Sequence, residues 1–132
     1  MGDSFFQREI YQFKTDNEGK FIKTQSYSKD SKEVWHFFLI LSNNRYNRGS
    51  SHYLAVCLST SPTQYYGLEL DPDAFENGKG LGRTNVLCDK VTRMDASFIN
   101  KDHATFKRCA KITEQTYNKV ITKINEFIKL QE

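Results

Sequence analysis

Apolar residues occur in short runs along most of the chain, and their spacing becomes helical near its end. Two runs, Val34–Leu41 and Tyr53–Leu58, are almost continuously apolar, as strands buried on both faces of a sheet are. We expect these two runs to be the central strands. Alternating apolar and polar residues predict further strands at 5–14, 21–27, 66–70, 85–91 and 107–109, the first with one solvated face.

The segments between these strands carry turn-forming residues. The 16–19 and 28–32 segments predict a turn and a loop, and 43–51 predicts a short, exposed, basic loop between the central strands. Three glycines in 78–82 favour a flexible connection over a phosphate-binding loop, because no strand directly precedes them and the Gly-Lys-Ser/Thr ending is missing.

The last part of the chain predicts an amphipathic helix. Its apolar residues recur at intervals of three and four; they are Tyr117, Val120, Ile121, Ile124, Phe127 and Ile128. Thr113 is the expected N-cap, because its hydroxyl can accept a hydrogen bond from the first turn. Short strands followed by one helix predict an α+β domain on a small curled antiparallel sheet.

Length and composition indicate a single globular domain over residues 1–132. The chain is 38% hydrophobic and 27% charged, as soluble proteins are. No apolar run approaches the ~20 residues that a membrane-spanning helix needs, and the first residues lack the pattern of a secretory signal. We therefore expect a cytoplasmic protein without a membrane partner.

The cysteines and the net charge exclude few classes of function. Cys57, Cys88 and Cys109 are widely spaced and have no metal-ligand intervals. Cys57 and Cys88 lie within apolar strand patterns, which favours core thiols over a zinc or redox site, and we predict no metal or cofactor. A net charge of +3 permits a nucleic-acid partner without requiring one.

Polar side chains follow both central strands. Ser42–Arg48 follows the first strand and Ser59–Ser61 follows the second. Strands fix geometry while loops stay solvated, so the ends of core strands are frequent places for sites in small β-folds. We expect the two ends to converge and to bind an anion.

From residue 37 onward the chain resembles the MazF/PemK family of bacterial toxin endoribonucleases. Four segments carry the similarity in family order: Leu39–Ser42 followed by Tyr46-Asn47, Ala55–Ser61, Val86–Asp95 and Ile112–Ile128. The resemblance implies a small SH3-like antiparallel β-barrel of the CcdB/PemK type with a C-terminal helix, assembled as a homodimer.

The chain departs from the family pattern before residue 37. The family typically has Arg-Pro directly before its second strand, the Arg being catalytic; counted back from Leu41, these positions are His36 and Phe37 here. The segment Val86–Asp95, in contrast, is close to the family's strand with an acidic-Gln-x-Arg-Thr-Ile-Asp pattern.

The resemblance implies a toxin that cleaves single-stranded RNA, messenger RNA in particular, without a metal. The ribose 2′-hydroxyl attacks the adjacent phosphorus and the 5′-oxygen leaves, which requires a base, an acid and donors to the phosphoryl oxygens. His36 suits either proton transfer, because an unperturbed imidazole has a pKa of ~6.5. Ser59 and Thr60 match a hydroxyl at the scissile phosphate, and Asp89 matches a carboxylate proposed as the base in part of the family.

Further residues suit RNA binding, and alternatives remain open. The candidates for the RNA backbone and for base stacking are Arg45, Arg48, Lys90, Arg93, Trp35 and Tyr65 or Tyr66. The implied protein partner is an acidic antitoxin with a disordered tail. Each candidate also has a structural interpretation: packing for His36, strand capping for Ser59 and Thr60, an ion pair for Asp89, and barrel aromatics for the tyrosines. The alternative functions are an RNA- or protein-binding module that lost activity with Arg-Pro, or gyrase inhibition as in CcdB relatives.

Overall fold

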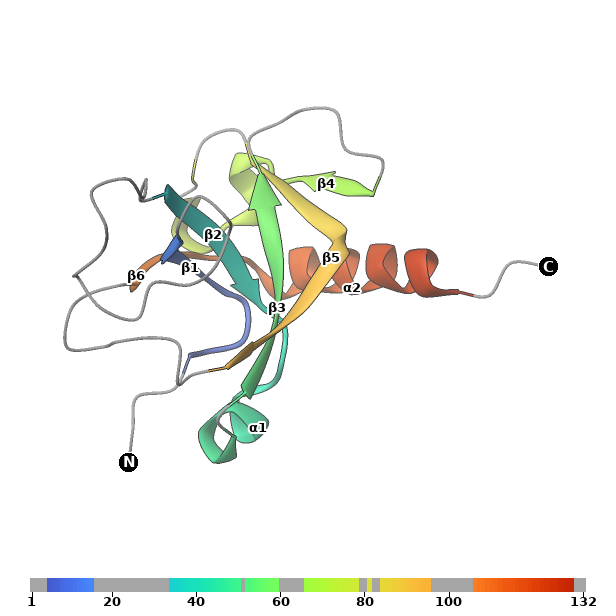
Figure 1. The fold of residues 1–132 in the computed structure, drawn as a ribbon. Coiled ribbons are helices and arrows are strands. Elements are labelled where there is room, and N and C mark those ends of the chain that lie inside the picture. The colour runs from blue at the N-terminus through green and yellow to red at the C-terminus, as the bar shows by residue number, and fades with distance from the viewer. Residues whose placement is uncertain are drawn as a thin grey trace.

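The computed structural model describes residues 5–15, 34–50, 52–59, 66–78, 81, 84–95 and 106–129. Within them, six strands form one curled antiparallel sheet in the order β4-β5-β3-β2-β1-β6 (Figure 1). The strands are β1 (Glu9–Thr15), β2 (Val34–Ile40), β3 (His52–Ser59), β4 (Gly67–Glu69), β5 (Asn85–Asp95) and β6 (Phe106–Lys111). The helices are α1 (Asn44–Gly49) and α2 (Glu114–Ile128), with the 3-10 turns η1 (Pro72–Ala74) and η2 (Glu76–Gly78).

The two most apolar runs form the centre of the sheet, as predicted. β2 and β3 are antiparallel neighbours, and the register runs from Phe38 opposite Cys57 to Ile40 opposite Ala55. The predicted strand at 21–27 and the connections at 16–19 and 28–32 lie outside the described residues. The α+β class with a curled antiparallel sheet and a C-terminal helix is confirmed.

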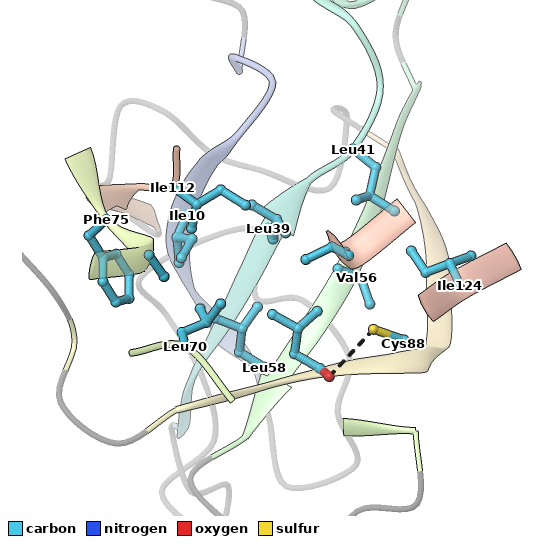
Figure 2. Packing of buried hydrophobic residues seen from close by; sticks show 13 residues of the cluster. Ile10, Leu39, Leu41, Val56, Leu58, Leu70, Phe75, Cys88, Ile112 and Ile124 are labelled. Carbon is cyan, nitrogen blue, oxygen red and sulfur yellow. Dashed lines mark hydrogen bonds between the residues drawn. The ribbon is translucent and has the colours of Figure 1, made fainter. Parts of the chain in front are cut away.

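A hydrophobic cluster fills each face of this sheet. The helix-side cluster lies between the sheet and α2 (Figure 2) and consists of Ile10, Leu39, Leu41, Val56, Leu58, Leu70, Ala74, Phe75, Val86, Cys88, Ile112, Val120 and Ile124. The far-side cluster lies on the other face and consists of Phe5, Tyr11, Phe13, Phe38, Ile40, Tyr53, Ala55 and Met94. Successive strand residues alternate between the two clusters because neighbouring side chains point to opposite faces.

The expectation of a solvated face on the first strand is wrong. Ile10 of β1 is buried in the helix-side cluster, whereas Tyr11 and Phe13 are buried in the far-side cluster. Phe5 precedes the strand and packs edge-on against Tyr11, with ring centroids 4.8 Å apart. The first strand is therefore buried on both faces, although its sequence alternates, because each face of the sheet has its own hydrophobic cluster.

The predicted basic loop between the central strands is wrong in part, because it contains α1. The Asn43 side chain caps this helix by accepting a hydrogen bond from the Tyr46 N–H at 2.8 Å. Asn47 is the one residue of α1 that is buried. A helix this short shows no apolar stripe, so its turn-forming residues dominate the pattern.

The other elements match their predictions with small shifts at the ends. Thr113 caps α2 as predicted, since its hydroxyl oxygen accepts the Thr116 N–H at 3.1 Å. β5 continues beyond the predicted end to Asp95, because its second half pairs with the first half of β3. Neither helix is long and apolar enough, over the described residues, to cross a membrane.

Candidate functional site

β2 and β3 separate at one end of their shared ladder. Their pairing ends at Phe38 opposite Cys57. On its other side, β2 pairs with β1 from Val34 to Leu39, and His36 lies opposite Phe13. After Cys57, β3 pairs with β5, and Ser59 lies opposite Asn85. The start of β2 and the end of β3 lie apart at the top of Figure 1. His36 and Ser59 stand beyond the last pair of the ladder between these two strands, and we call this end of the ladder the opening between β2 and β3.

His36 and Ser59 lie on the same face of the sheet at this opening. His36 shares the face of its cross-strand partner Phe13 and of Phe38, both in the far-side cluster. Ser59 is two residues from Cys57, which packs against the same cluster. The His36 side chain is exposed and Ser59 is half-buried. An imidazole and a hydroxyl thus stand at opposite sides of the opening, away from α2.

β5 is kinked beside this opening. Val56 of β3 lies opposite Val91, but Leu58 lies opposite Val86. Between these two pairs β3 has one residue, Cys57, whereas β5 has four, Leu87–Lys90. The kink allows β5 to pair with β4, and the Cys88 N–H donates to the Tyr66 carbonyl oxygen at 3.1 Å. Such an irregularity bends the strand and re-aims its side chains. Here it contains the half-buried Asp89 and the exposed Lys90.

The thiols near the kink stay protonated at neutral pH. Burial raises the pKa of Cys57, against an opposing effect of the Lys90 charge. Burial also raises the pKa of Cys88 to about 11; Lys123 opposes this shift, whereas Asp89 and Glu126 add to it. Neutral thiols are poor nucleophiles and poor metal ligands. This agrees with the prediction that Cys57 and Cys88 are core residues.

The basic candidates on α1 lie far from His36 and Ser59. Arg45 and Arg48 are exposed on α1, which precedes β3, whereas Ser59 ends β3. Arg93 lies opposite Leu54 near the start of β3, and from Leu54 to Ser59 an extended strand advances about 16 Å. The expected convergence of the two strand ends is therefore wrong, because antiparallel neighbours end at opposite edges of a sheet.

A cavity of about 330 Å³ adjoins this second group of residues. It is lined by Ser42, Asn43, Tyr46, Tyr53, Leu54 and Arg93. Its floor is rigid, because the Ser42 hydroxyl accepts the Leu54 N–H at 3.0 Å and donates to the Asn47 side-chain oxygen at 2.6 Å. The structure thus places one group of candidates, with His36, Ser59, Asp89 and Lys90, at one end of β3 and the candidate arginines at the other end.

Three of the predicted site residues are not placed. Thr60 and Tyr65 lie outside the described residues, and the structure describes only the backbone of Trp35, in β2. Tyr66 is described: its ring packs edge-on against Phe127 of α2 at a centroid distance of 4.9 Å. Tyr66 is therefore a packing residue.

Sequence reasoning missed a buried polar cluster between β1 and β6. The Glu9 carboxylate accepts hydrogen bonds from the Tyr11 hydroxyl at 2.6 Å and from the Arg108 guanidinium at 3.1 Å. Glu9 is only 6% exposed, and an alternating strand pattern gives no sign that an acidic residue is buried. The cluster joins the edge strand β6 to the sheet. Among the described residues, no group of three or more His, Cys, Asp or Glu side chains is placed to hold a metal ion.

Comparison with known proteins identifies the family and the fold. A family model described as "PemK-like, MazF-like toxin of type II toxin-antitoxin system" matches residues 21–128. None of the curated proteins is significantly similar to the chain in sequence. A chain of MazE-MazF (Form-II) from Deinococcus radiodurans has 11% identity and a TM-score of 0.64, over 98% of this chain and all of its own length.

Two mycobacterial structures share the same fold. An endoribonuclease from a Mycobacterial species has 18% identity and a TM-score of 0.60, over 98% of this chain and 96% of its own. An endoribonuclease in complex with its cognate antitoxin, also mycobacterial, has 20% identity and a TM-score of 0.57, over 98% of this chain and 99% of its own. At such identities the likeness shows the fold, with the curled sheet and terminal helix in common.

Proposed function

The chain belongs to the PemK-like, MazF-like family of toxins of type II toxin–antitoxin systems, and from this we propose that it is an endoribonuclease that cleaves single-stranded RNA at specific sequences without a metal. The observation that carries the proposal is the opening between β2 and β3. There His36 and Ser59 lie on one face, beside the kink that contains Asp89 and Lys90.

In the proposed reaction, the side chains at the opening divide the proton transfers. The Asp89 carboxylate takes the proton of the ribose 2′-hydroxyl, whose oxygen attacks the adjacent phosphorus. The protonated His36 imidazole donates its proton to the 5′-oxygen as the bond from phosphorus to that oxygen breaks. The hydroxyls of Ser59 and Thr60 donate to the non-bridging oxygens, where charge accumulates. The products are a 2′,3′-cyclic phosphate and a free 5′-hydroxyl.

The basic residues extend the proposed RNA path beyond the cleavage point. Lys90 lies beside the opening, whereas Arg45, Arg48 and Arg93 lie about 16 Å away along β3. In this proposal they bind phosphates of nucleotides that flank the cleaved bond, and Trp35 and Tyr65 stack on unpaired bases. A separation of this size suits recognition of several consecutive nucleotides rather than of one.

We further propose that the protein is a homodimer and acts in the cytoplasm on messenger RNA, until a cognate acidic antitoxin blocks it. Exposed apolar side chains on β3, β5 and α2 are the candidates for the dimer interface, since contiguous apolar surface marks interfaces. They are Leu54 (43% exposed) and Val91 (37%) on the helix side of β3 and β5, and Phe127 (43%) and Ile128 (68%) in the last turn of α2. The exposed arginines of α1 suit an acidic antitoxin segment.

The test is cleavage of a long single-stranded RNA by purified protein in EDTA. We expect cuts at a short recurring sequence, mapped by primer extension, with 2′,3′-cyclic phosphate ends. Replacing the ribose before a cut by 2′-deoxyribose should abolish that cut, because the attacking oxygen is then missing. RNA that stays intact but binds the folded protein would instead support the RNA-binding module, for which the His36 replacement of the family Arg is the reason.

A further inference from the structure

The second half of β5 is regular, which fixes the face of each of its side chains. Val91 lies opposite Val56 of the helix-side cluster, and Thr92 lies opposite Ala55 of the far-side cluster. Opposite residues of an antiparallel pair point to the same face, and successive residues alternate. Cys88 also lies in the helix-side cluster, so the alternation breaks once between Cys88 and Val91. Lys90 borders this break, and its charge acts on the thiol of Cys57, which packs against the far-side cluster. Lys90 therefore lies near the far-side face. This is the face of Cys57, His36 and Ser59.

Arg93 points the other way. Its cross-strand partner is Leu54, two residues from Val56, so Arg93 lies on the helix-side face. Val91 and Arg93 share that face, whereas Thr92 lies on the other, the face near which Lys90 lies. Of the two cations in this part of β5, Lys90 is the one that lies near the face of the opening.

The other described arginines are unsuited to a phosphate at the opening. Arg108 donates to the buried Glu9 carboxylate at 3.1 Å, and Arg8 donates to Glu76 at 2.8 Å. Arg45 and Arg48 are on α1, beyond the far end of β3. Lys90 is exposed, and none of the ion pairs in the described part of the chain involves it. Its ammonium group is thus available to an incoming anion.

We propose that Lys90 is a catalytic residue that contacts the scissile phosphate and stabilises the negative charge on its non-bridging oxygens. The inference rests on the proposed function. It gives Lys90 a role in the chemical step, whereas Arg93 acts in binding alone. A compact ammonium charge placed where charge develops lowers the barrier without taking part in proton transfer.

The departures from the family pattern fit this role. His36 stands where the pattern has Arg, and Lys90 stands where it has Gln. Thr92 stands at the second Arg of the pattern, on the face near which Lys90 lies. This face therefore lacks both guanidinium groups of the pattern and has gained one ammonium group. Lys90 restores part of the lost positive charge.

The experiment compares Lys90→Gln with Lys90→Arg in steady-state cleavage of a short RNA that contains one mapped cut site. We expect Lys90→Gln to lower kcat by about 10²-fold, the effect of removing one donor at a developing oxyanion, with a smaller change in KM. Lys90→Arg should keep most of the activity because it keeps the charge. The matched control is Lys119→Gln, an exposed lysine on α2, which should leave kcat and KM as in the wild type.

Two further variants separate catalysis from binding and from folding. Arg93→Gln, the same charge change on the other face, should raise KM more than it lowers kcat. Adding Thr92→Arg to Lys90→Gln should recover part of the lost kcat, because a guanidinium then returns to the face while His36 keeps its role in proton transfer. Equal melting temperatures for wild type and Lys90→Gln would exclude a folding defect.

The outcomes distinguish this inference from the proposed function. If the wild type cuts RNA and Lys90→Gln cuts with an unchanged kcat, the role of Lys90 is wrong and the ribonuclease stands. A loss confined to KM would also contradict a catalytic role. If the wild type leaves RNA intact, the proposed function itself fails, and the role of Lys90 fails with it.

Discussion

Asn47 is a buried polar residue that joins three separate parts of the chain. It is 1% exposed, its side-chain nitrogen donates to the carbonyl oxygens of Phe5 and Ser42 at 2.9 Å each, and its oxygen accepts the Ser42 hydroxyl at 2.6 Å. These bonds fix α1 against the N-terminal segment and the end of β2. Asn47 belongs to the Tyr-Asn pair that resembles the family motif, and these bonds give it a structural role.

We predict that Asn47→Ala lowers the free energy of unfolding by about 3 kcal/mol, because buried bonding partners lose their hydrogen bonds. The measurement is urea unfolding followed by circular dichroism. Asn118→Ala is the matched control: this residue is exposed on α2, and the change should stay within about 0.5 kcal/mol. Equal stabilities of the two variants would show that the network contributes nothing.

The buried thiol of Cys88 makes the free energy of unfolding depend on pH in the alkaline range. Burial raises its pKa from 9.0 to about 11. The folded protein thus holds the proton more tightly than the unfolded chain, so the contribution is full below pH 9 and is lost as pH rises towards 11. The raised pKa values of Tyr53, Tyr117 and Cys57 act in the same direction.

We therefore predict that the free energy of unfolding falls between pH 9 and 11, and that Cys88→Ala reduces the slope by up to ~1.4 kcal/mol per pH unit. The slope is the informative quantity, because the substitution also removes core volume and lowers stability at every pH. Urea titrations at several pH values measure it. Identical slopes for the two proteins would contradict the burial of an ionisable thiol.

At the scale of single elements, α2 depends on its first turn as well as on its apolar side. Val120 and Ile124 are buried in the helix-side cluster, and Thr113 caps the helix. We predict that Thr113→Ala lowers stability by about 1 kcal/mol, as the loss of an N-cap does. In Thr122→Ala, the exposed Thr122 loses only a bond to the Asn118 carbonyl oxygen, and stability should change by less than about 0.5 kcal/mol. Thermal unfolding distinguishes them, and equal losses would contradict the cap.

Long, strongly patterned elements could be predicted from sequence, whereas short or irregular ones could not. The apolar runs of β2 and β3 and the helical spacing of α2 each follow from burial, so their positions were clear. α1 was missed because one buried residue, Asn47, is too little to show a helical period. The kink at Asp89 was missed because it arises from pairing with both β3 and β4, and no local pattern records two partners.

At the scale of the whole molecule, the candidate site was predicted in its parts but not in its arrangement. His36, Ser59 and Asp89 were found from a family pattern, and the structure places them around one opening or its kink. The prediction that Arg45 and Arg48 lie near Ser59 is wrong, because antiparallel neighbours end at opposite edges of the sheet. Which face Lys90 and Arg93 occupy depends on the register with β3, which the sequence does not contain.

The proposed dimer gives a prediction for the whole assembly. Replacing the exposed Ile128 and Leu54 together by Lys should convert dimer to monomer, because charges would then be buried at the interface. Light scattering after size exclusion gives the mass. A Lys at the exposed polar residue Asn118 should leave the mass at that of the dimer. A wild-type protein that is monomeric at all concentrations would contradict the proposal.

The most direct test of the proposed chemistry is the rate of RNA cleavage by His36→Ala in EDTA under single-turnover conditions. We expect a loss of about 10²-fold or more relative to the wild type, because a general acid is removed. His52→Ala, at the opposite end of β3, should keep its rate within a few fold. Cleavage by His36→Ala at the wild-type rate would contradict the placement of the chemistry at the opening between β2 and β3.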